Sequence, residues 1–86
     1  MKLKQEFVLR TIAGDTVLIP VGKLGDKFHG VITLNETGKF IWEKLEEGKE
    51  PADIAAALTD EYEVPYQKAV DDVGKICGQL RELGVL

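Results

Sequence analysis

The sequence predicts an α+β domain in which a three-stranded antiparallel β-sheet is followed by three α-helices. Two observations lead to this fold class: residues 7–34 have the alternating apolar pattern of β-strands, and apolar residues at helical spacing dominate from there onward. A third is the length of 86 residues, which suits one small hydrophobic core. We therefore expect residues 1–86 to form a single domain.

The strands come first. Residues 7–12 and 16–21 are rich in β-branched and apolar side chains and are separated by a turn signal, so they predict an antiparallel hairpin. Pro20 lacks an N–H group and is expected at a strand end or a sheet edge. Residues 21–29 have the glycines and polar residues of a flexible loop. Residues 30–34 then predict a short third strand.

The first predicted helix starts directly after this strand. Asn35 is a favourable N-cap, and Gly48 has the conformational freedom that closes a helix. Between them, Ile41, Trp42 and Leu45 form an apolar stripe. The only tryptophan of the chain is therefore expected in the core rather than in a ligand site.

Two further helices are predicted. Pro51 suits the first position of one of them, because its missing N–H is not needed there. The last helix extends from Tyr66 to a stop at Gly84, followed by an apolar tail expected to fold back onto the core. Its apolar positions follow a four-three spacing and are Ala69, Val73, Ile76, Leu80 and Leu83.

A second face of this last helix contains Gly74 and Gly78, beside Val70, Cys77 and Arg81. Each interior glycine costs roughly 1 kcal/mol relative to alanine in an exposed helix. Close packing against a neighbouring element is the favoured explanation, and a binding groove is the alternative.

Composition excludes several classes of protein. The formal charge is −4, and the helical half is the more acidic one, which disfavours a nucleic-acid footprint. No apolar run approaches the ~20 residues of a membrane span, and the first residues do not resemble a signal peptide. A single cysteine agrees with a reducing compartment. We expect a cytoplasmic protein.

The sequence also lacks a catalytic constellation. His29 and Cys77 are the only residues of their types and have no metal-ligand spacing, and Cys77 is expected to be a small buried hydrophobe. No pair of carboxylates is specified as general acid and base, and no glycine loop is followed by a helix that would hold phosphate. These absences predict a protein that is not an enzyme and needs no cofactor or metal.

Three strands, three helices and a tight proline-containing turn between the last two helices indicate a winged-helix-like arrangement. Such folds often bind DNA through a basic recognition helix. Here the last helix balances its charges, with Lys68, Lys75 and Arg81 opposing Asp71, Asp72 and Glu82. DNA binding is therefore disfavoured, and the edge of the third strand, where an extended peptide could pair, is the stronger candidate.

An ordered set of residues at fixed spacings runs from the third predicted strand to the end of the chain. Its members are Leu34, Asn35, Gly38, Ile41, Trp42, Leu45, Gly48, the run from Ile54 to Leu58, Tyr62, Val64, Asp72, Val73, Leu80 and the closing Leu83 to Leu86. With this set the sequence resembles, over residues 4–86, the pyrroloquinoline-quinone biosynthesis protein D (PqqD-like) family, also called the RiPP recognition element. The resemblance implies a peptide chaperone that captures the leader segment of a ribosomally made precursor by β-strand addition and presents it to a modifying enzyme, often of the radical S-adenosylmethionine type.

Carried over by position, the resemblance also implies a binding site. Asp72 would pair with a basic leader residue, although it can equally be an ordinary exposed helix charge. A winged-helix DNA-binding or transcription-regulatory module is the alternative function, and a homodimer formed through a strand edge is left open. The implied peptide contacts are Gly30, Val31, Ile32 and Thr33 from the third strand, with Asp72 and Ile76 from the last helix.

Overall fold

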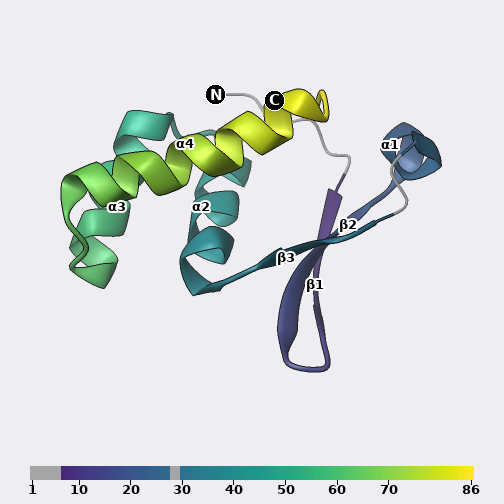
Figure 1. Cartoon of the computed structure of the whole chain (residues 1–86), viewed down its shortest axis with the longest axis horizontal. Coiled ribbons are helices and arrows are strands. Elements are labelled where there is room, and N and C mark those ends of the chain that lie inside the picture. Colours follow the sequence, from purple (N-terminus) through teal and green to yellow (C-terminus); the bar gives the residue numbers. More distant parts are fainter. Residues whose placement is uncertain (1–6, 28–29) are drawn as a thin grey trace.

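A computed structural model describes residues 7–27 and 30–86, and every structural statement below concerns those residues. The elements are β1 (Phe7–Ile12), β2 (Asp15–Pro20), α1 (Gly22–Lys27), β3 (Ile32–Leu34), α2 (Glu36–Glu46), α3 (Pro51–Tyr62) and α4 (Tyr66–Glu82). The sheet is antiparallel with strand order β1-β2-β3, and the three long helices follow it, which confirms the predicted α+β class. Figure 1 shows α4 lying across the other long helices on one side of the sheet.

The prediction of a loop over residues 21–29 is wrong for most of its length, because Gly22–Lys27 forms the short helix α1. Gly22 enters this helix at φ +61°, and the N–H of Gly25 donates to the carbonyl of Val21 over 3.3 Å. Leu24 is only 6% exposed and belongs to the hydrophobic core. A single buried leucine thus holds a turn of helix that is too short for a periodic pattern; residues 28 and 29 lie outside the described part.

The β1–β2 hairpin has a two-residue loop. Ala13 and Gly14 have φ values of 52° and 86°, as a type I′ turn requires, and the turn joins Ile12 to Asp15. This turn fixes the register of β1 against β2, where one slipped residue would move every side chain of a strand to the opposite face.

The third strand is shorter than predicted. It covers Ile32–Leu34, whereas the sequence indicated residues 30–34. Pro20 gives the physical reason: it ends β2 opposite Phe7, and its next pairing position toward β3 would be Gly30. Because Pro20 has no N–H to donate, the β2–β3 ladder ends two residues earlier along β2, at Leu18 and Ile32.

The junction from β3 to α2 forms as predicted. The side-chain oxygen Oδ1 of Asn35 accepts a hydrogen bond from the N–H of Gly38 over 2.8 Å. Gly48 adopts φ +84° just beyond the helix. Trp42 is 1% exposed and meets the ring of Phe7 edge-to-face at 5.9 Å between centroids. The first strand and the first long helix therefore share one core.

The buried face of α4 differs from the predicted set at three positions. Cys77 is 2% exposed and lies in the core, whereas Ile76 and Leu83 are only partly buried. α4 packs mainly against α3 and to a lesser extent against α2. Val85 is fully buried, and its N–H donates to the carbonyl of Leu80, so the predicted return of the C-terminal tail is confirmed.

Candidate functional site

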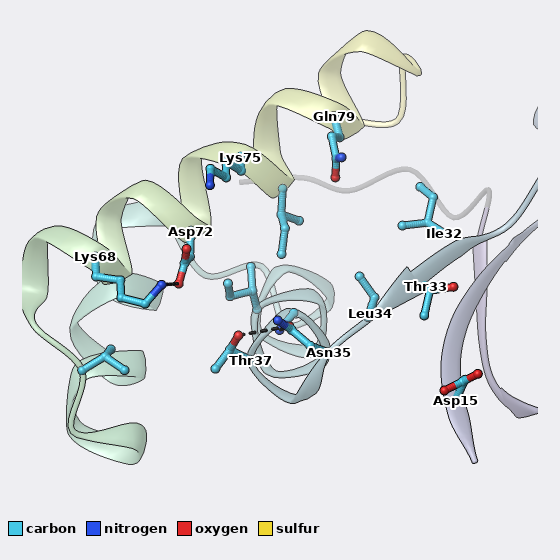
Figure 2. A pocket seen from close by; sticks show the side chains of 14 residues that line it. Asp15, Ile32, Thr33, Leu34, Asn35, Thr37, Lys68, Asp72, Lys75 and Gln79 are labelled. Atoms are coloured by element: carbon cyan, nitrogen blue, oxygen red, sulfur yellow. Dashed lines mark hydrogen bonds and ion pairs between the residues drawn. The ribbon is translucent and has the colours of Figure 1, made fainter.

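A groove of about 840 Å³ lies between β3 and α4 and includes the start of α2. Figure 2 shows side chains from both elements facing this space. The groove has an apolar floor and polar residues along the α4 rim. The floor comes from Ile32, Leu34, Ile41, Val64 and Ile76, and the rim on α4 from Lys68, Asp72, Lys75 and Gln79.

The register of the sheet determines which main-chain groups face this groove. In a two-residue hairpin the residues that flank the loop exchange hydrogen bonds, so Ile12 and Asp15 form such a pair. The direction of the main-chain groups alternates along a strand, and Thr16 therefore turns its own groups toward its β3 partner Leu34. It follows that the N–H and C=O of Thr33 point to the free edge of β3.

The side chains of β3 alternate between the two faces of the sheet. Ile32 and Leu34 point from β3 toward α4, whereas Thr33 lies on the other side of the strand (Figure 2). Leu34 is buried and Ile32 is half-buried. The edge therefore offers free main-chain groups at Thr33, with an apolar surface on either side of it.

An ion pair crosses one turn of the α4 rim. The Nζ atom of Lys68 lies 3.4 Å from Oδ2 of Asp72, and the side chain of Asp72 is the less exposed of the two. The carboxylate of Asp72 thus already has a basic neighbour in the free protein. Pairing with a basic ligand residue would require the ammonium group of Lys68 to be displaced or shared.

Four of the six predicted contact residues meet in one place. Ile32, Thr33, Asp72 and Ile76 line the groove. Gly30 and Val31 lie before the strand, outside the lining, and Val31 is 53% exposed. That these six residues contact a peptide stays a prediction.

Sequence reasoning missed several lining residues of α4 and α2. The signal for the α4 residues was present, because Lys68, Lys75 and Gln79 share the helix face of Asp72 at intervals of four and three. The signal for Thr37 was weaker: its hydroxyl donates to Oδ1 of Asn35 over 3.1 Å, which belongs to the cap of α2.

The other face of α4 corrects the prediction of tight glycine packing. A Cβ atom at Gly74 or Gly78 would meet no atom within 4 Å among the described residues, so these glycines do not allow another element of the chain to approach. Gly74 instead lines a separate groove of about 300 Å³ between α3 and α4, together with the exposed side chains of Tyr66 and Val70. For Gly74 the geometry therefore supports the groove alternative, whereas Gly78 lines neither of these two grooves.

The described residues hold no group of three or more potential metal ligands. Burial raises the pKa of the Cys77 thiol, and the nearby charge of Arg81 opposes this shift only in part. A raised pKa keeps the thiol protonated and hence a poor nucleophile. None of the described helices is both long and apolar enough to cross a bilayer.

Comparison with known proteins gives two solved structures that cover nearly the whole chain. The first is TbiB1 in complex with the TbiA(beta) leader peptide, with a TM-score of 0.76 and 29% identity over 100% of this chain and 94% of that chain. The second is lasso peptide synthetase B1 complexed with the leader peptide, with a TM-score of 0.72 and 32% identity over 94% of this chain and 89% of that chain.

A search of curated proteins finds no match. The family comparison, in contrast, covers most of the chain: the family described as coenzyme PQQ synthesis protein D matches residues 8–86. That span contains all three strands except the first residue of β1, and all the helices. The chain belongs to the coenzyme PQQ synthesis protein D (PqqD) family.

Proposed function

We propose that this domain binds the leader segment of a ribosomally made precursor peptide as an added strand on the free edge of β3. The observation that carries the proposal is the orientation of Thr33, whose N–H and C=O face outward beside the groove. Main-chain pairing gives affinity for an extended segment, and pockets for alternate side chains give selectivity. Both parts of that arrangement are present at this edge.

The relatives support the same function. TbiB1 and lasso peptide synthetase B1 are similar to this chain over almost its full length, and both structures are complexes with a leader peptide. No comparison supports the alternative of a DNA-binding module. The rim of α4 also argues against it, because Asp72 lies between Lys68 and Lys75 on the groove face.

In this proposal the domain is a recognition element rather than an enzyme. It holds the leader while a separate modifying enzyme acts on the remainder of the precursor, and the family resemblance favours a radical S-adenosylmethionine enzyme in the cytoplasm. Gly30 and Val31 extend the paired segment when the leader binds, since Val31 has the same strand parity as Thr33.

An NMR titration tests the proposal. The ¹⁵N-labelled full chain is titrated with the synthetic leader of a precursor peptide encoded beside its gene, and a scrambled leader serves as the control. We expect shifts at residues 30–34 and along the Lys68–Gln79 face of α4, with little change at Tyr66, Val70 and Gly74 on the other groove. An unchanged spectrum at high leader excess, or shifts centred on β1, would contradict strand addition at β3.

A further inference from the structure

In the groove beside β3, one basic side chain has no charged partner among the described residues. Of its charged lining residues, Lys68 and Asp72 form an ion pair, and Asp15 belongs to β2 across the sheet. Lys75 lies one helical turn beyond that pair, is exposed, and has no carboxylate within 4.0 Å among the described residues. The α4 rim therefore carries one net positive charge.

The neighbours of Lys75 on its own helix do not neutralise it. Asp71, one turn earlier, accepts a hydrogen bond from the side-chain amide of Gln67 over 3.0 Å. Gln79, one turn later, is uncharged and also lines the groove. The ammonium group of Lys75 is thus available to a ligand that lies along β3.

The apolar floor fixes where such a ligand places its other side chains. In an added antiparallel strand, the residue opposite Thr33 points away from α4, and the residues before and after it point into the groove. There they meet Ile32, Leu34 and Ile76, whose side chains form the floor. Lys75 precedes Ile76 in α4 and lies at the rim above this floor (Figure 2).

We propose that the leader segment recognised by this domain is an acidic one: a carboxylate on the groove side of the added strand pairs with Lys75, and apolar side chains fill the floor next to it. This inference rests on the proposed function and names the chemistry of its ligand. The whole chain has a formal charge of −4, so it repels an acidic peptide at long range. Inside the groove, where the carboxylate of Asp15 lies on the β2 side, the α4 rim alone is locally positive and offers an acidic side chain a partner.

A random peptide library is the probe. A phage-displayed library of random dodecapeptides is selected against the wild-type chain, against Lys75→Glu, and against Lys49→Glu, which makes the same charge change at an exposed residue outside the groove. We expect wild type and Lys49→Glu to enrich Asp or Glu at one position beside alternating apolar residues. Lys75→Glu should enrich Lys or Arg at that position and retain the apolar pattern.

Affinity measurements complete the test. For one selected acidic peptide, followed by fluorescence polarisation, Lys75→Glu should weaken binding by roughly three- to tenfold, as a partly exposed charge pair does, and added salt should reduce the difference. If the peptides show the alternating apolar pattern but no acidic position, and bind both variants equally, the charge proposal is wrong and strand addition stands. If no peptide is enriched on wild type, the proposed function fails as well.

Discussion

The two edges of the small sheet differ in length and in what surrounds them. β1 offers a six-residue edge and β3 only three residues, so length alone would favour β1 as the place where a peptide adds. At β1, however, the register turns the carbonyl of Leu9 outward, and Nη1 of Arg10 donates to it over 2.8 Å. At β3, no side chain among the described residues hydrogen-bonds to the outward groups of Thr33, and these groups lie beside a groove.

This difference shows that the side chains around an edge strand decide whether a peptide can bind there. A charged side chain that occupies an outward carbonyl is one way in which natural sheets discourage edge pairing. An apolar groove next to a free edge does the opposite, because it adds side-chain burial to the main-chain hydrogen bonds. The same sheet thus carries one protected edge and one receptive edge.

The largest effect on binding should come from proline at the receptive edge. Thr33→Pro removes the outward N–H and no bond of the β2–β3 ladder, so the fold should survive while leader affinity falls by about tenfold or more. Thr11→Pro is the matched control, since the N–H of Thr11 points outward from β1 by the same parity. Isothermal titration calorimetry measures the leader affinity of both variants. If both lost the same affinity, β3 would not be the preferred edge for the leader.

A smaller effect should follow from the cap that ends β3. Asn35→Ala removes the acceptor for the Gly38 N–H and should lower the free energy of unfolding by about 1 kcal/mol. Asn35→Asp keeps a capping oxygen and serves as the control. Urea denaturation measures both. If the alanine variant unfolded at the same urea midpoint as wild type, the Asn35 cap would not stabilise the fold. The position of β3 would then depend only on its pairing with β2.

The sequence was sufficient for the parts of the fold that rest on local chemistry. The Asn35 cap, the stop at Gly48 and the burial of Trp42 follow from residue type and spacing, and the structure confirms them. The helix α1 could not be predicted from the sequence, because its stability depends on the tertiary burial of Leu24. The start of β3 could not be predicted either. It depends on whether the main-chain nitrogen of Pro20 points toward β3, and only the register of the folded hairpin determines that direction.

The candidate site was also predicted only in part. The strand residues and Asp72 came from the family resemblance, and the structure places Ile32, Thr33, Asp72 and Ile76 along one groove. The importance of Lys75 could not be read from the sequence. It depends on Lys68, rather than Lys75, being the partner of Asp72, and both lysines are within helical reach of that carboxylate.

The smallest expected effect concerns the protected edge. Arg10→Ala exposes the carbonyl of Leu9 and should strengthen self-association through β1 about twofold, because one added main-chain hydrogen bond at an exposed edge contributes about 0.5 kcal/mol, the low end of its usual range. Sedimentation velocity over a range of concentrations measures this, with Arg81→Ala on α4 as the control for loss of charge. Self-association that is unchanged in Arg10→Ala but abolished in Thr33→Pro would place the self-pairing surface at β3. The leader and a second copy of the chain would then compete for one edge.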